Sequence, residues 1–493
     1  MVRIALLPLL IILWLSGCNQ QQPSGIRFGV QQLPFNFDPR QATDAASERV
    51  NHLLYQGLVR FDESRRPQPD LATWERPAPR RYRFTLIGDP RFDDGSPVTM
   101  RDVVATYRTI LDPAANSPHR STLAVIREMH LVNERTLDFL LDRSDPYFPS
   151  YLSSGVLPAR LIGSSHDFNS KPVGSGPFRL LSREAGKLLL ERKSDGLPVS
   201  LLLVREPSVR VLKLLRSEID LLQNDLPPSL VDYLARQSGV EVEAAPGSNY
   251  TYLGFNLEDP LTGDLRIRRA IAHAIDRDAI IEHVFRGRAR KAAGLFPPEH
   301  PLGMDVRHAV AFDPQKSMAL LREAGYGPGN PLELTWKTSS DPFRLRLATI
   351  MQQQLADVGI RVRIKSYDFG TFFGDIKGGN FQLYSLTWVG LKTPDSFRYI
   401  FHSDSIPPGG ANRGRYRSAR TDALIESAES ESDSDDQLPL YRLLQRELLQ
   451  DLPYVPLWYE DQFAAYRPEA IDGYTPGRDG SYDTLIELEQ RGK

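Results

Sequence analysis

Residues 332–367 restrict the fold of this chain more than any other stretch, because their hydrophobic period changes twice. Residues 332–337 (LELTWK) and 360–367 (IRVRIKSY) alternate between apolar and other side chains, which is the period of a strand. Between them, residues 343–358 have the spacing of an amphipathic helix, and Gly359 follows as a stop signal. This order predicts a βαβ unit with parallel strands, and therefore a sheet of the α/β class.

Other segments carry equally explicit helix signals. Thr99 and Asp102 form the pattern of a capping box ahead of an apolar helical stripe. A second helix is expected to begin at Asp313-Pro314 and to stop at Gly325. Helices and strands intermix along the chain, so the predicted fold class is α/β throughout.

The chain of 493 residues contains one cysteine, Cys18. Before it lies a basic N-terminus and an apolar run over residues 4–15, which has the length of a signal-peptide core and is too short to span a bilayer. The run ends in Leu15-Ser16-Gly17-Cys18, which resembles a bacterial lipobox. We therefore expect residues 1–17 to be a lipoprotein signal peptide, with a covalent lipid on Cys18 and a tether over residues 18–25. A plain signal peptide with an incidental cysteine is the alternative.

Composition limits the remaining possibilities. A lipidated Cys18 leaves no thiol for a disulfide, so the mature chain must be stable through its cores alone. Its length is too great for one core, which predicts about three domains. The net charge of −2 offers no excess of positive charge, so nucleic acid is not an expected partner.

Motifs of catalysis are missing from the sequence. The histidines form no HExxH pattern, and no GxSxG element occurs. Gly174-Ser175-Gly176 lacks the further glycine or lysine of a nucleotide-binding loop, and it predicts a tight turn instead. The acidic run at residues 427–436 lacks the glycine of an EF-hand. These absences make an enzyme, a metal site and a bound cofactor less expected, although catalytic residues can be dispersed along a sequence.

Several stretches, in family order, resemble the peptide/nickel solute-binding proteins of ABC importers, family 5. They are FDPR (37–40), LLYQGLVRFD (53–62), PDLATWE (69–75), YRFTL (82–86), RFDDGSPVTMRDVVATY (91–107), KPVGSGPFRL (171–180), YLGFNLEDPLTGDLRIRRAIAHAIDRDAII (252–281), DPQKSMALLREAGY (313–326) and LPYVPLWY (452–459). On the long block at 252–281 we expect Arg266, Arg268 and Arg269 to face solvent.

The resemblance implies a two-lobed clamp, similar to class II periplasmic binding proteins, with an additional third domain. Lobe I would comprise residues 26–47, 170–258 and 466–493, domain II residues 48–169, and lobe III residues 259–465. A ligand that touches both lobes would stabilise the closed state over the open one.

The same resemblance implies a function. The protein would capture peptides or peptide-like solutes outside the cytoplasm and deliver them to an ABC permease and its ATPase. It would be a periplasmic monomer held to an inner or outer membrane by its lipid. A periplasmic hydrolase and a sensor without a transporter are alternatives on the same scaffold, and nickel, haem and sugars remain open as ligands.

Ligand specificity is where this sequence departs from the family. Peptide-binding members often carry W-x-x-D, whose aspartate pairs with the peptide α-ammonium. Here the segment is LTWVGLKTPDSF, in which Trp388 matches but Leu391 stands at the aspartate position. Either another carboxylate takes that role, with Asp395 and Glu460 as candidates, or the ligand has no free α-amine there. The alternative is that Asp395 and Glu460 are both surface carboxylates without a role in binding.

The other candidate ligand-binding residues are polar or aromatic. Arg413 and Arg415 could pair bidentately with a carboxylate or phosphate, or be loop arginines with partners in the protein. The aromatic Tyr252 could line the cleft or the core. The set is completed by Asp44, Ala45, Asn256 and Val389.

Overall fold

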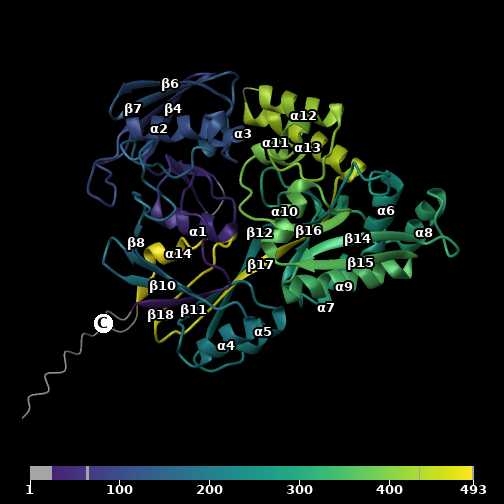
Figure 1. Ribbon diagram of the computed structural model, residues 1–493. Coiled ribbons are helices and arrows are strands. Elements are labelled where there is room, and N and C mark those ends of the chain that lie inside the picture. The colour runs from purple at the N-terminus through teal and green to yellow at the C-terminus, as the bar shows by residue number, and fades with distance from the viewer. Residues whose placement is uncertain (1–24, 63–65, 432, 491–493) are drawn as a thin grey trace, which may run out of the picture.

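The computed structural model describes residues 25–62, 66–431 and 433–490 (Figure 1). The expected signal peptide at residues 1–17 and the expected lipid site at Cys18 lie outside the described residues. Within the described ranges, no helix is long and apolar enough to cross a membrane.

One large mixed sheet runs through the molecule (Figure 1). Its 11 described strands are, in spatial order, β15 (Ile360–Tyr367), β14 (Leu332–Ser339), β16 (Leu383–Trp388), β12 (Glu241–Phe255), β17 (Tyr454–Tyr466), β11 (Leu221–Gln223), β1 (Ile26–Val30), β10 (Pro198–Leu203), β9 (Lys187–Arg192) and β8 (Phe178–Glu184), with β13 (Ala289–Lys291) beside β17.

The predicted βαβ unit is present. β14 and β15 pair in parallel, beginning with Leu332 opposite Ile360, and α9 (Pro342–Asp357) joins them. Asp341 caps the helix by accepting from the backbone N–H of Arg344. Gly359 follows its end with φ +94°, a conformation that glycine adopts without steric cost.

Two long strands hold the halves of the sheet together. β12 pairs antiparallel with β17 from Glu241 opposite Tyr466 to Gly254 opposite Tyr454. The ladder is interrupted between Ala245 and Asn249, a segment that contains a proline and a glycine. Such an irregularity bends a strand locally, and a second one follows between Thr251 and Tyr252.

A second, smaller sheet forms a separate layer at the upper left of Figure 1. Its strand order is β4 (Ala72–Ala78), β5 (Arg81–Leu86), β7 (Thr136–Leu141) and β6 (Ile126–Asn133), and α2 (Met100–Leu111) packs with it. The predicted capping box opens α2, because the Thr99 backbone N–H donates to Asp102 Oδ2 at 2.7 Å.

The remaining described elements surround the two sheets. They are α1 (Ala45–Leu54), β2 (Val59–Phe61), β3 (Pro67–Pro69), η1 (Pro113–Ala115), α3 (Arg120–Leu123), η2 (Phe148–Tyr151), α4 (Pro207–Leu215), α5 (Pro228–Leu234), α6 (Leu265–Ala274), α7 (Arg277–His283), η3 (Val306–His308), α8 (Pro314–Glu323), α10 (Phe369–Gly378), α11 (Asp395–Phe401), η4 (Ser403–Ser405), α12 (Ala419–Ser430), α13 (Ser434–Asp451), β18 (Ile471–Asp472), α14 (Thr484–Glu487) and β19 (Glu489–Gln490).

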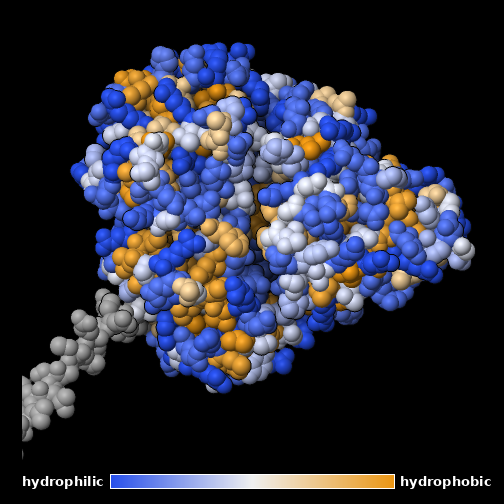
Figure 2. Space-filling view, viewed as in Figure 1, coloured by the Kyte–Doolittle hydropathy of each residue, from blue (hydrophilic) through white to orange (hydrophobic). Residues whose placement is uncertain are grey.

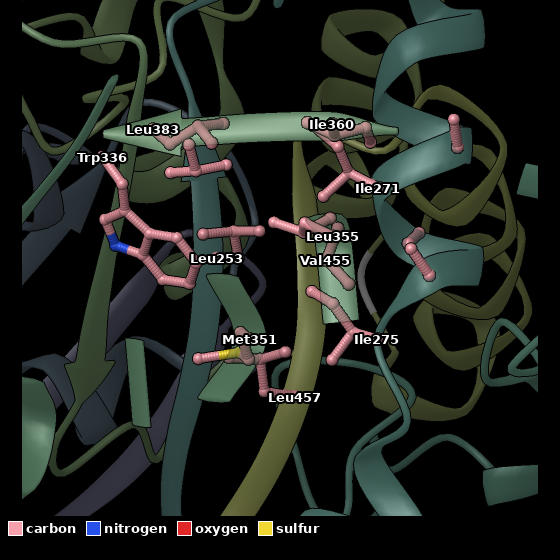
Figure 3. Close-up of a cluster of buried hydrophobic side chains, with 14 of the residues drawn as sticks. Leu253, Ile271, Ile275, Trp336, Met351, Leu355, Ile360, Leu383, Val455 and Leu457 are labelled. Carbon is pink, nitrogen blue, oxygen red and sulfur yellow. The ribbon is translucent and has the colours of Figure 1, made fainter. Parts of the chain in front are cut away.

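Separate hydrophobic cores lie under the two sheets. In the core of Figure 3, Ile271 of α6 and Leu355 of α9 lie among strand residues, including the fully buried Trp336. A different cluster, drawn from residues 58–156, forms the core of the small sheet. Burial of apolar surface stabilises a fold by about 25 cal/mol per Å². In this protein that stabilisation is divided among several cores.

One expectation about the arginines of α6 is wrong. Arg266 is exposed, but Arg268 is only 5% exposed. Its guanidinium donates to the carbonyls of Thr262, Gly263 and Asp451, the last at 2.7 Å. Asp451 is the final residue of α13, whose last carbonyls have no partner within the helix, so Arg268 closes a helix end from a neighbouring element.

The glycines of the PVGSGPF segment allow the backbone to pass close to the end of α1, which is a stronger requirement than the predicted tight turn. A Cβ on Gly174 or Gly176 would collide with the carbonyls of Leu54 or Leu53 at the end of α1. The backbone N–H of Gly176 donates to the Leu54 carbonyl at 2.9 Å. The two glycines therefore seat the chain directly against the helix that borders the cleft.

Candidate ligand-binding cleft

Figure 2 shows a crevice between the half that carries the small sheet, β1 and β8–β11, and the half that carries β14–β16. Contacts cross this crevice. The Gln31 side-chain amide donates to Asp341 Oδ2 at 3.2 Å, and Lys392 Nζ lies 3.8 Å from Asp479 Oδ2. The Lys392 ammonium also lies over the Phe61 ring, 4.6 Å from its centroid.

A second set of bridges joins the small-sheet domain to α11 and α12. Glu429 accepts from Arg398 on its own side and from Arg143 on the other, the Arg143 Nη2–Glu429 Oε2 distance being 2.9 Å. The Thr122 hydroxyl donates to Asp395 Oδ2 at 3.3 Å. The two halves are therefore in direct contact at several points across the crevice.

Arg413 lies among aromatic rings beside Trp388 at the end of β16, next to the loop whose Lys392 contacts the other half. Its guanidinium carbon is 4.4 Å from the Trp388 ring centroid and 4.9 Å from that of Phe373. Its Nη1 is 3.5 Å from the Tyr252 hydroxyl, and among the described residues no carboxylate forms an ion pair with it. Stacking of this kind orients a guanidinium but does not neutralise its charge.

The aromatic residues around Arg413 form one continuous stack. Tyr252 on β12 lies parallel to Tyr454 with ring centroids 3.9 Å apart, and it also stacks on Trp388. Tyr252 is fully buried, so of the two readings left open it is a core residue, and its hydroxyl accepts from Arg413. Tyr399 packs edge-on against Trp388.

Glu460 is already engaged by the protein. Its carboxylate pairs with Arg344, with Nη2–Oε2 at 3.0 Å, and also accepts from Thr251 Oγ1 and from Trp458 Nε1. Burial acts to raise the pKa of this carboxyl, but the charge and hydrogen bonds of Arg344 outweigh burial and lower it. The group is therefore ionised and braces β17 against α9. Its role as an ammonium acceptor stays a prediction without support from this geometry.

Several other candidates have structural partners. Arg415 Nε lies 3.4 Å from Glu258 Oε2, and Arg415 Nη1 donates to the Arg413 carbonyl. The Asn256 amide donates to two carbonyls, of Gly379 and Phe381.

The remaining candidates divide between helix α1 and the loop after β16. Asp44 is the N-cap of α1 and accepts from the Ser47 N–H, and Ala45 is the first residue of that helix. Val389 is 36% exposed on the loop after β16, whereas Leu391 packs against the aromatic core.

Sequence reasoning missed two residues of the cleft. Phe373 of α10 contributes one face of the Arg413 box, and Glu48 of α1 is a partly buried carboxylate. Burial raises the pKa of Glu48, partly offset by the charges of His52 and Lys392. No local pattern marks either residue, because their importance arises only when α1 and α10 are brought to the loop after β16.

The comparisons with known proteins agree with this architecture. The family described as bacterial extracellular solute-binding proteins, family 5 Middle, matches residues 66–407, which is more than half of the chain. The protein belongs to this family. It is thus a solute-binding protein, as the sequence motifs predicted, and the expectation that it is not an enzyme is confirmed by the class.

Individual relatives match over almost the full length. The chain is 28% identical over 509 aligned residues to Di/tripeptide-binding protein 2 of Pseudomonas aeruginosa, covering 94% of this chain and 95% of that one. The oligopeptide-binding protein AppA of Bacillus subtilis, solved with a nonapeptide, has a TM-score of 0.86 at 23% identity over 95% of this chain and 99% of that one. NikZ of Campylobacter jejuni, solved with Ni(L-His), has a TM-score of 0.85 at 22% identity over the same shares.

These likenesses confirm the α/β two-lobed fold.

Among the described residues, no group of three or more His, Cys, Asp or Glu side chains is placed to hold a metal ion.

Asp395 provides a test of the cleft's electrostatics. Burial raises the pKa of its carboxyl from 3.8 to about 6, against the lowering effect of hydrogen bonds from Thr393 and Thr122. The stability that the neutral carboxyl contributes is complete below 3.8 and is lost as pH rises through about 6. Asp395→Asn should therefore raise the melting temperature relative to the native protein more at about pH 7 than at about pH 4. An equal difference at both pH values would contradict this assignment.

Proposed function

We propose that the protein is a periplasmic lipoprotein that captures peptides or peptide-like solutes in its interlobe cleft and delivers them to the permease and ATPase of an ABC importer. The observation that carries the proposal is the crevice between two halves that contact each other, together with the Arg413 side chain stacked on aromatic rings beside the loop after β16. Names of the relatives, which include di/tripeptide- and oligopeptide-binding proteins, support peptides as the ligand class.

The proposed division into lobes follows the chain segments given above. Lobe I would be residues 26–47, 170–258 and 466–493, domain II residues 48–169, and lobe III residues 259–465. β12 and β17 would be hinge crossings, since they pair with each other between β16 of one half and β11 of the other. A ligand bound between the halves would bury its polar groups, and the cleft would have to supply their hydrogen-bond partners.

The binding function is tested by a thermal-shift screen of the protein purified in mild detergent. Probes would be a pooled tripeptide library with free amines, the same library N-acetylated, and Ni(L-His). A ligand at 100 times its Kd adds about 2.7 kcal/mol to the free energy of unfolding, so a rise in melting temperature is expected with at least one peptide pool. Recovery of the peptides intact, checked by mass spectrometry, is expected of a receptor, whereas cleavage would favour the hydrolase alternative. A shift with Ni(L-His) alone would replace peptides as the ligand class.

Comparison of the two peptide pools addresses the loss of the family aspartate at Leu391. Stabilisation by free-amine peptides only would mean that another carboxylate binds an ammonium. Equal stabilisation by acetylated peptides would mean that the cleft does not bind the free α-amine of the peptide.

The proposed anchor has its own test. Cells supplied with an alkyne-bearing fatty acid should incorporate it into the native protein, and Cys18→Ser should abolish the label because the chain has no other thiol. A native protein without label, or a labelled Cys18→Ser variant, would contradict lipid attachment at Cys18.

A further inference from the structure

Arg413 is a cation for which the described residues supply no counter-charge. A guanidinium carries five N–H donors in its own plane, and stacking on rings leaves those donors unsatisfied. In the described part of the chain, the only acceptor that Arg413 reaches with its side chain is the Tyr252 hydroxyl, at 3.5 Å. Arg413 is partly buried, and a charge removed from water requires a partner.

A second donor lies beside the first. Trp388 Nε1 is buried and has no hydrogen-bond partner among the described residues, although its ring lies under the Arg413 guanidinium. An indole N–H can only donate, so it requires an acceptor that the described protein does not supply. Two unsatisfied donors on contacting side chains indicate one missing acceptor group between the lobes.

The neighbouring arginine, Arg415, has hydrogen-bond and ion-pair partners within the protein. Arg415, two residues away, has both a carboxylate, that of Glu258, and a backbone carbonyl, that of Arg413, as partners. Arg344, also in the interlobe region, is paired with Glu460. Among the described residues, Arg413 therefore differs from Arg415 and Arg344 in having no anionic partner.

We propose, on the basis of the proposed function, that Arg413 and the Trp388 N–H together bind a carboxylate of the peptide-like ligand. The planar fork of a guanidinium matches the two oxygens of a carboxylate. Leu391, which follows Trp388 by three residues, packs in the aromatic core and offers no acceptor for an ammonium. The cleft thus anchors its ligand through an acidic group, and the ring of Phe373, on which Arg413 stacks, lies beside that group.

The experiment compares one tripeptide pool made as free acids and as C-terminal amides, with binding read by native mass spectrometry and by melting temperature. The native protein should bind the acids at least about tenfold more tightly than the amides, because a charge-assisted hydrogen bond is lost in the amides. Retention of only those amides that carry Asp or Glu would place a side-chain carboxylate at Arg413, and it would also support the proposal.

Three variants and a control separate binding from folding. Arg413→Gln should lose the preference for acids while keeping the melting temperature of the ligand-free protein. Arg413→Lys should retain part of the preference, since it keeps the charge without the planar fork, and Trp388→Phe should weaken binding of acids because it keeps a ring but removes the N–H donor. Arg307→Gln removes the same charge from a side chain that is 86% exposed, and it should bind as the native protein does.

The outcomes are distinguishable. Equal binding of acids and amides by the native protein, or an unchanged preference in Arg413→Gln, overturns the carboxylate site and leaves the receptor function standing. Binding of neither pool by the native protein overturns the peptide-receptor function and the carboxylate site with it.

Discussion

The pairing of β12 with β17 is the interaction on which the rest of the structure depends. Both strands continue from one half of the sheet into the other, so every displacement of the halves must bend this ladder. The break between Ala245 and Asn249 localises that bending, and Glu460 lies opposite Asn249 at its edge. The ion pair of Glu460 with Arg344 of α9 therefore connects the hinge to the half of the sheet that carries the βαβ unit.

The electrostatics of the cleft follow from this division. Where a charge joins two elements of the protein it has a partner, as Glu429 has in Arg143 and Arg398. Arg413, stacked among aromatic rings, has no such anion among the described residues. A protein that binds by closing can leave such a charge to its ligand, because the energy of pairing then contributes to closure.

Local patterns predicted the elements well and the cleft poorly. The alternation of residues 332–337 and 360–367 and the capping box at Thr99 are short-range signals, and each produced the expected element. Arg268 was misplaced, because the helix end that it closes belongs to α13, far along the chain. Trp388 and Leu391 were identified through a motif, but Phe373 and Glu48 come to the cleft only through tertiary packing, which no local pattern encodes.

The central claim, that ligand closes the two halves, is tested most directly by a distance between them. Spin labels at Arg80→Cys on the small-sheet domain and Lys365→Cys on β15 would both be exposed, with Cys18 replaced by Ser so that only these thiols react. Without ligand, double electron–electron resonance should give a broad distribution that includes longer distances. The tripeptide free-acid pool should narrow it to the single shorter distance of the closed form. Identical distributions with and without the pool, at concentrations where binding is measured, would contradict the account.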